Sequence, residues 1–257
     1  MKTTIFAVTV IFALSLASAA QQKRPPVAAH FGGDAGSDSP IRSNGPLSVT
    51  PPPLCNPCFF YGGDINPNDI NADALSDENT LLILGGSATY GAVILPYQAA
   101  LKGIVFNVLA SAAFDPKSAG YDIRENVSEG NGGFSVQSGT SNIQIAATGR
   151  NVFGFTEYEI AVHFPTVTLQ PNTEYWFNVE PQCLNGAQDG SCYVGRFFAS
   201  NTTQGTNSIH GMFQPQHSMF FNSTYFAATW ENWCDPSLQL TQGECNLLSY
   251  GLVGTPN

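Results

Sequence analysis

The densest group of oxygen ligands in this chain is Asp64, Asn66, Asn68 and Asp69. Side-chain oxygens at alternate positions can surround a hard cation such as calcium. The start of the group matches the D-x-N-x-N of an EF-hand loop, but Asp69 stands where that loop needs glycine. Two interpretations therefore stay open. One is a calcium site, and the other is a loop whose Asn and Asp side chains bond their own backbone.

A second group centres on Trp176, which has Glu174 and Asn178 two residues away on either side. On a strand these three side chains share one face. A flat aromatic ring beside hydrogen-bonding groups can stack on a sugar and read its hydroxyls, so we expect glycan contact here. Large aromatic side chains also serve packing, and a covering loop is the alternative. Trp230 and Trp233 offer a second aromatic pair.

The third group is the carboxylate pair Glu157 and Glu159. Strand geometry places the two carboxylates roughly 6–7 Å apart, close to the spacing of a glycosidase pair. An acidic pair at this spacing is also what a solvated strand face carries. The chain contains no nucleophile elbow, metalloprotease histidine pair or phosphate-cradling loop. The sequence therefore predicts no enzyme, with a secreted hydrolase of polysaccharide as the alternative.

The elements that position these residues are two strands joined by a turn at Pro171-Asn172. Apolar and polar residues alternate along both strands, which indicates an antiparallel sheet with one dry and one wet face. The dry face is expected to hold Tyr158, Ile160, Val162, Phe164, Tyr175, Phe177 and Val179. The wet face is expected to hold Glu157, Glu159, His163, Glu174, Trp176, Asn178 and Glu180.

Similar strand patterns recur from residue 81 to residue 253 and are separated by turns rich in glycine. We expect strands at 81–84, 92–95, 101–110, 121–126, 134–137, 142–147, 153–164, 166–169, 174–180, 193–199, 218–221 and 247–253. Residues 104–109 are apolar on both faces and predict a central strand. Residues 75–82 have room for one helical turn. The pattern favours an all-β, two-sheet antiparallel sandwich that is jelly-roll-like.

The N-terminal region predicts export. Residues 1–19 form a signal peptide, with Lys2, an apolar run and the small-residue cleavage site Ala17-Ser18-Ala19. Residues 20–54 are rich in Pro, Gly and Ser and predict a disordered tail. Residues 55–257 then form a single β domain. We expect a secreted protein, or one of the periplasm or cell envelope, with no membrane insertion after cleavage.

Charge and cysteine content support this interpretation. The net charge of −10 makes nucleic acid a poor partner. Six cysteines behind a signal peptide favour disulfides, and their proximity favours the pairs 55–58, 183–192 and 234–245. The six are Cys55, Cys58, Cys183, Cys192, Cys234 and Cys245. A redox or zinc role of Cys55 and Cys58 is the alternative. The oligomeric state stays open.

Several segments together resemble a group of secreted bacterial proteins of unknown function. These segments are FFYGGDINPNDINADALSDENT at 59–80, SEGNGGF at 128–134, ATGRNVFGFTEYEIAV at 147–162, LQPNTEYWFNVEP at 169–181, FFNSTYF at 220–226 and LLSYGLVGT at 247–255. Members of that group carry one jelly-roll-like domain and often end in a PEP-CTERM sorting tail, which this sequence lacks. The resemblance implies fold and export, and it implies no catalytic residues.

From these observations we expect an exported, non-catalytic β-sandwich with a binding or structural role, and glycan binding as one such role. We expect no cofactor, with calcium at residues 64–69 as the alternative. The partner to expect is an extracellular glycan or another surface component.

Overall fold

The computed structural model describes residues 54–55, 57–65, 74–77, 87–152, 154–183, 197–202, 218–222, 230–232 and 247–256. Everything described is strand, turn or irregular structure, with no helix in these ranges. The same ranges accordingly contain no helix that could cross a membrane. The strands are β1 (Cys58–Tyr61), β2 (Ala74–Asp77), β3 (Ser87–Ile94), β4 (Ala99–Ala110), β5 (Ser118–Glu125), β6 (Phe134–Val152), β7 (Phe155–Leu169), β8 (Glu174–Gln182), β9 (Phe197–Thr202), β10 (Ser218–Asn222), β11 (Trp230–Asn232), β12 (Leu247–Leu248) and β13 (Tyr250–Pro256).

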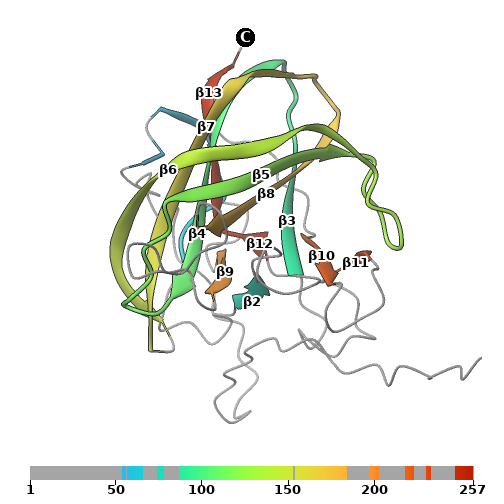
Figure 1. Cartoon of the computed structure of the whole chain (residues 1–257). Helices are drawn as coiled ribbons and strands as arrows, with labels where there is room; N and C mark the ends of the chain where they lie inside the picture. Colours follow the sequence, from blue (N-terminus) through green and yellow to red (C-terminus); the bar gives the residue numbers. More distant parts are fainter. Residues whose placement is uncertain are drawn as a thin grey trace, which may run out of the picture.

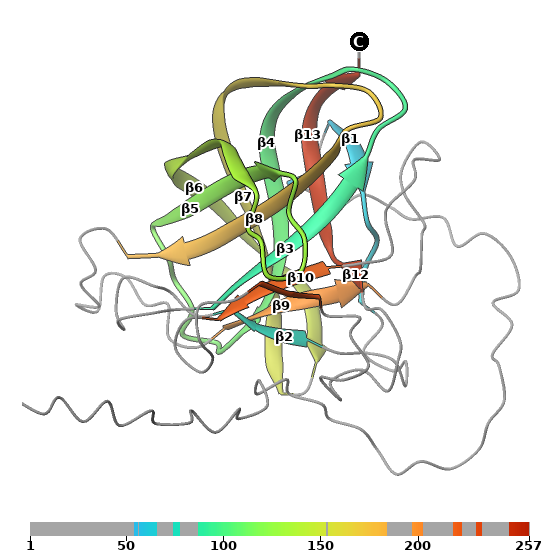
Figure 2. The ribbon, with the colours of Figure 1, turned by 90° about the vertical axis from the view of Figure 1, so that its right-hand side faces the viewer.

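These strands form one antiparallel sheet that curls into a half-barrel. Its order is β1-β13-β4-β7-β6-β5-β8-β3-β10-β11, and β9 links β2, β12 and β4. The corner of the curl is β6, a strand of 19 residues. Its first half pairs with β5 and its second half with β7. As a result β5 and β8 cross in front of β4 and β13 (Figure 1), and β3 crosses the same strands obliquely in the turned view (Figure 2).

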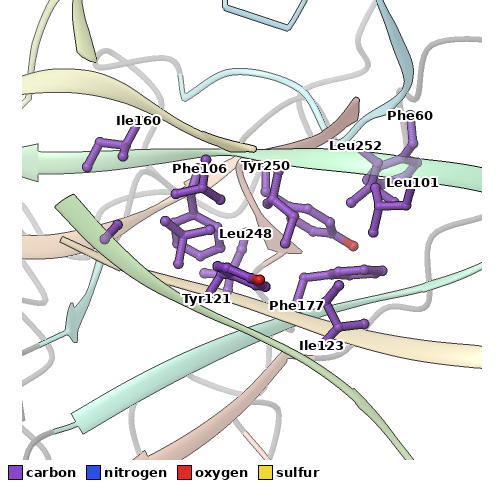
Figure 3. Packing of buried hydrophobic residues seen from close by; sticks show 14 of the residues in the cluster. Phe60, Leu101, Phe106, Tyr121, Ile123, Ile160, Phe177, Leu248, Tyr250 and Leu252 are labelled. Atoms are coloured by element: carbon purple, nitrogen blue, oxygen red, sulfur yellow. The ribbon is translucent and has the colours of Figure 1, made fainter. Parts of the chain in front are cut away.

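The main core fills the space between the two limbs of the curl. One limb is β1-β13-β4-β7, on one side of β6, and the other is β5-β8-β3-β10-β11, on the other side. Tyr250 of β13 lies near its centre, with its ring centroid 5.2 Å from that of Phe60, 6.3 Å from Phe106 and 6.0 Å from Phe177 (Figure 3). Its hydroxyl donates to the carbonyl of Ala92 across the core, at 2.7 Å. This bond ties β13 to β3 and satisfies the buried polar end of the ring.

The close approach of Tyr250 to β3 explains a glycine in the middle of that strand. A Cβ at Gly91 would lie 2.5 Å from Cε1 of Tyr250. No side chain larger than a hydrogen fits there unless the ring moves. Gly91 therefore lets the two limbs of the sheet meet closely.

The predicted all-β antiparallel class is confirmed, and the two-sheet jelly-roll arrangement stays a prediction. The predicted dry face is also confirmed. Ile160, Val162, Tyr175, Phe177 and Val179 belong to the main core, and Tyr158 and Phe164 pack against it partly buried.

The predicted wet face is wrong at four positions. Glu157 is 0% exposed, Glu159 and Trp176 are each 1% exposed, and Asn178 is 4% exposed. The reason is that the outer faces of both limbs are covered by other segments. His163 does lie exposed, as expected.

Three further comparisons concern the predicted elements. The strands expected at 134–137 and 142–147 are parts of the single strand β6. The helical turn expected at 75–82 is wrong in its first part, because Ala74–Asp77 forms β2. The signal peptide, the tail up to residue 53 and the strand expected at 81–84 lie outside the described residues.

Candidate functional site

A covering segment crosses the outer face of β4, β7 and β13. We name it the strap, and it consists of residues 54–55 and 57–65. The disulfide Cys55–Cys58 closes its first loop, with Cα atoms 5.0 Å apart. Both cysteines pack with Tyr61, Val105, Ala161 and Val253 in a small buried cluster of their own. The strap thereby encloses the polar side chains that face outward from the middle of β4 and β7.

The centre of this enclosed region is an ion-pair chain. The Nε–H of Arg150 donates to Oε2 of Glu157, and a second guanidinium nitrogen donates to Oδ1 of Asp64 at 2.9 Å. Side-chain exposure falls from 26% for Arg150 and 19% for Asp64 to 0% for Glu157. Arg150 thus joins the β6–β7 hairpin to the strap.

The hairpin supplies this arginine through an irregular stretch of β6. The register with β7 shifts between Ala147 and Asn151, and Gly149 within it has a φ of +82°. Such irregularities re-aim side chains locally. Here both Thr148 and Arg150 bond the same carboxylate, with Thr148 Oγ1 donating to Glu157 Oε2 at 2.9 Å.

Glu157 has a full set of donors. Its Oε1 accepts from Ser200 of β9 at 3.0 Å, and its Oε2 accepts from Thr148 and Arg150. Burial raises the pKa of Glu157, while Arg150 and the two hydroxyl groups oppose that rise. The carboxylate therefore serves as the buried end of the ion-pair chain.

Glu159 is the second outward carboxyl of β7, and it differs from Glu157. Among the described residues, the backbone N–H of Leu54 donates a hydrogen bond to Oε2 of Glu159, at 3.2 Å. Burial raises the pKa of Glu159, the Leu54 bond and Arg150 oppose this rise, and Glu157 and Asp64 reinforce it. The four charged groups therefore form one electrostatic cluster.

A polar chain extends from this cluster to β13. The hydroxyl of Tyr61 donates to Asp64 Oδ1 at 2.5 Å. Asn107 Nδ2 donates to the Tyr61 oxygen at 3.2 Å and to Ser249 Oγ at 2.8 Å. Ser249 Oγ in turn donates to the carbonyl of Gly63 at 2.6 Å. We name Tyr61, Asp64, Asn107, Arg150, Glu157, Glu159 and Ser249 together the outer network.

The network does not provide the open carboxylate pair that hydrolysis of a glycosidic bond requires. Glu157 and Glu159 do share a face, as predicted, but both are covered, and Glu157 is engaged by an arginine. A substrate has no access to either side chain in this arrangement.

The predicted sugar platform at Trp176 is also wrong in its geometry. The indole packs in a buried cluster with Ala88, Tyr90, Ala92, Val127 and Met219. Asn178 is buried beside it and donates to the carbonyl of Thr89 at 2.9 Å, whereas Glu174 is partly exposed. Neighbouring strands and the β5–β6 loop cover this face, so the ring cannot stack on a sugar.

A partly exposed aromatic residue adjoins that cluster. The rings of Trp230 and Tyr90 lie 4.9 Å apart, and the Arg124 guanidinium lies 5.1 Å from the Trp230 ring centroid. Arg124 also pairs with Asp122 at 2.5 Å. A Cβ on Gly132 would lie 2.4 Å from the Trp230 indole. Trp230 is therefore packed against neighbours on several sides, and Trp233 lies outside the described residues.

Of the four residues predicted to bind calcium, Asp64 alone lies within the described residues. Asp64 is engaged by Arg150 and Tyr61, while Asn66, Asn68 and Asp69 lie outside those residues. The described ranges contain no group of three or more His, Cys, Asp or Glu side chains arranged to hold a metal.

Of the cysteine predictions, the 55–58 pairing is confirmed. Cys183 is disulfide-bonded as well. Cys192, Cys234 and Cys245 lie outside the described residues, so the other two pairings stay predictions.

Within the described ranges, a long run of exposed and partly exposed side chains lies along β6. Phe134 is 52% exposed and Val136 is 38% exposed, and they are the exposed large hydrophobic residues of the described chain. Between Phe134 and Gly149 this strand has no charged side chain. The polar side chains along this stretch, each exposed or partly exposed, are Ser135, Gln137, Ser138, Thr140, Ser141, Asn142, Gln144 and Thr148.

An aromatic pair lies beside the first half of β6, where that strand separates from β7. Tyr121 and Phe164 stack with ring centroids 4.6 Å apart. Gln137 Nε2 lies 3.4 Å from the Tyr121 hydroxyl and 3.5 Å from the carbonyl of Pro165. Ser141 Oγ donates to the carbonyl of His163 at 2.8 Å. Side chains of β6 thus reach across to backbone carbonyls of β7.

Sequence reasoning missed the residues that matter most in both regions. No sequence motif marks Arg150, Asn107 or Tyr61, because the partners of these residues lie far away in the chain. Phe134 was assigned to a strand without any surface role. A usable signal was present in β6, where hydroxyl and amide residues replace the apolar alternation of the other strands.

Comparisons with protein-family models, with curated proteins and with solved structures find no match to this chain.

Proposed function

We propose that this protein is an exported, non-catalytic binding protein that holds an uncharged extracellular glycan along β6. The jelly-roll-like arrangement and the export of the chain are parts of the same proposal. The observation that carries it is the exposed aromatic ring of Phe134, at the head of a charge-free strip of hydroxyl and amide side chains.

The chemistry of the strip favours a neutral polymer. A chain with a net charge of −10 repels anionic polymers at long range. The β6 strip itself has no charges that a charged ligand would pair with. Hydroxyl and amide groups both donate and accept hydrogen bonds, as sugar hydroxyls do. An exposed aromatic ring among them offers the apolar contact that the C–H face of a sugar needs.

The shape of β6 also suits an extended ligand. Nineteen residues in strand conformation, at a rise of about 3.3 Å each, span roughly 60 Å. The first half of this strand has both faces largely exposed. A polymer of several sugar units fits along such a strip, with Phe134 at one end.

The buried state of Glu157 and Glu159 argues against the hydrolase alternative. The proposal is therefore binding without turnover. A direct check is that the protein releases no reducing ends from any polysaccharide that it retains.

The test is a pull-down of the mature protein with cellulose, chitin, xylan and mannan, and with alginate as an anionic comparison. Phe134→Ala is expected to weaken retention at least tenfold. It should leave the melting temperature nearly unchanged, because the ring is half exposed. Lys102→Ala, at an exposed position of β4, a strand that does not pair with β6, serves as the matched control and should bind as the wild type does. Retention of no neutral polymer, or equal retention by Phe134→Ala, would refute the proposal.

A further inference from the structure

The orientation of the Asn107 amide is fixed by its neighbours. The Tyr61 hydroxyl gives its one proton to Asp64, and the Ser249 hydroxyl gives its one proton to the Gly63 carbonyl. Both hydroxyl oxygens can therefore only accept from Asn107. Its Nδ2 must face them, at 3.2 and 2.8 Å, and its Oδ1 must point away.

That Oδ1 is buried, and none of the described residues donates to it. Asn107 is 0% exposed. A buried carbonyl oxygen without a donor costs about 1–3 kcal/mol relative to one that is satisfied. A donor is therefore expected on the side of Asn107 that faces away from Ser249.

On that side, the register partner of Asn107 is Glu159 of β7. Strand β4 lies between β13 and β7. Asn107 bonds Ser249 through its backbone on one flank and is the register partner of Glu159 on the other. Directly opposed side chains of an antiparallel pair have Cβ atoms about 4.5–5.5 Å apart. An ionised Glu159 would present a second acceptor to the orphan oxygen.

The surrounding charges distinguish Glu159 from Glu157. Among the described residues, the cluster combines the carboxyls of Asp64, Glu157 and Glu159 with the guanidinium of Arg150 alone. Arg150 bonds Asp64 and Glu157, and Thr148 and Ser200 complete the donors of Glu157. Glu159 accepts one hydrogen bond, from the N–H of Leu54. Its register partner on β4, Asn107, carries the buried oxygen to which no described residue donates.

We propose that Glu159 and Asn107 form a proton-binding site, in which Glu159 is protonated at neutral pH and its hydroxyl donates to Asn107 Oδ1. The proton comes from solvent and converts the carboxylate to a neutral acid, so the charge of the four-group cluster changes from −2 to −1. The second oxygen of Glu159 continues to accept from Leu54. The protonated carboxyl of β7 thereby bonds both Leu54 of the strap and Asn107 of β4, and so holds the strap against these strands.

The consequence is a strap that loosens as the pH rises. Burial raises the pKa of Glu159 in the folded state above its unfolded value. Stability from such a group is present at low pH and is lost as the pH rises through the folded pKa. The strap carries Tyr61 and Asp64, whose hydroxyl and carboxylate share one hydrogen bond, and Arg150 of β6 faces them. Loss of the Glu159 proton therefore adds a charge directly beside that set.

The test compares the wild type with Glu159→Gln in the full mature protein between pH 5 and pH 9. Glutamine reproduces the protonated acid, because its oxygen can accept from Leu54 while its amide donates to Asn107. Hydrogen exchange of the strap amides, corrected for the intrinsic pH effect, should become at least threefold faster in the wild type between pH 7 and pH 9. It should stay constant in Glu159→Gln. Glu129→Gln, at an exposed loop position, should behave as the wild type does.

A second measurement does not depend on any variant folding well. Infrared spectra of the wild type labelled with ¹³C-glutamate should show one protonated carboxyl at pH 7 that disappears at high pH. The proposal is overturned if no such band exists, or if Glu159→Gln lowers the melting temperature by the same amount at every pH. It is also overturned if added calcium, rather than protons, protects the strap of the wild type and has no effect on Glu159→Gln.

Discussion

Removal of Arg150 is the perturbation with the largest expected effect on the outer network. Arg150→Met keeps most of the aliphatic side chain but deletes the guanidinium that pairs with Glu157 and Asp64. Glu157 is 0% exposed, so its charge is left without a counter-ion in a region that water does not reach. Breaking a buried pair by removing one partner costs about 3–5 kcal/mol.

The value expected here lies at the lower end of that range. Arg150 is 26% exposed, and Thr148 and Ser200 still donate to Glu157 in the variant. We therefore expect Arg150→Met to lower the free energy of unfolding by about 3 kcal/mol at pH 7.5. Burial already raises the pKa of Glu157 in the wild type, and Arg150 opposes that rise. The variant must therefore have a still higher pKa at Glu157.

The sign of the pH dependence follows from that higher pKa. A carboxyl whose folded pKa exceeds the unfolded value of about 4.3 favours folding at low pH and opposes it as the pH rises. The cost of Arg150→Met should therefore be smaller at pH 5 than at pH 7.5, because a protonated Glu157 needs no counter-ion.

Urea unfolding at the two pH values measures both costs. The matched control is Lys117→Met, because Lys117 pairs with Asp115 at 2.5 Å but both side chains are about half exposed. Such a surface pair contributes about 0–0.5 kcal/mol, with little dependence on pH in this range. An equal loss for both variants, or a cost of Arg150→Met that grows toward pH 5, would refute the burial argument.

Other predictions concern packing and the pH dependence of the wild type. Trp176→Ala should cost about 3–5 kcal/mol in urea unfolding, and an unchanged stability would contradict its buried place. Gly251→Ala should destabilise the strap, because a Cβ there would lie 2.1 Å from Cys55 Sγ. A thiol assay and a melting curve decide this, and a variant as stable as the wild type would show that the strap can yield. The wild type should melt at a higher temperature at pH 5.5 than at pH 8.5, since burial raises the pKa of Glu157 and Glu159 alike.

The strands could be predicted because the signal for them is local. In β7 and β8 the apolar residues alternate over the strand itself, and this period alone predicted the buried set from Ile160 to Val179. The curl could not be predicted in the same way. Strand β6 changes partner from β5 to β7 near residue 142, and apart from its polar composition no local pattern marks that change.

What covers the outer face depends on contacts between residues far apart in the chain. Leu54 and Glu159 are separated by 105 positions, and Asp64 and Arg150 by 86. A two-residue period tells which side chains share a face, but it does not tell whether another segment lies on that face. For this reason Glu157, Glu159 and Trp176 were assigned to solvent although all three are buried.

The low charge content of the chain offers a sounder way to interpret such residues. Only 11% of its residues are charged, while Ser, Thr, Asn and Gln supply the solvated faces, as they do along β6. In such a protein a charged residue is not needed to keep a strand face wet. A pair such as Glu157 and Glu159 within an otherwise uncharged strand surface therefore indicates a specific partner. In this fold the partner of Glu157 is Arg150 of the β6–β7 hairpin. The strap that covers both carboxyl groups adds the carboxylate of Asp64, which pairs with the same arginine.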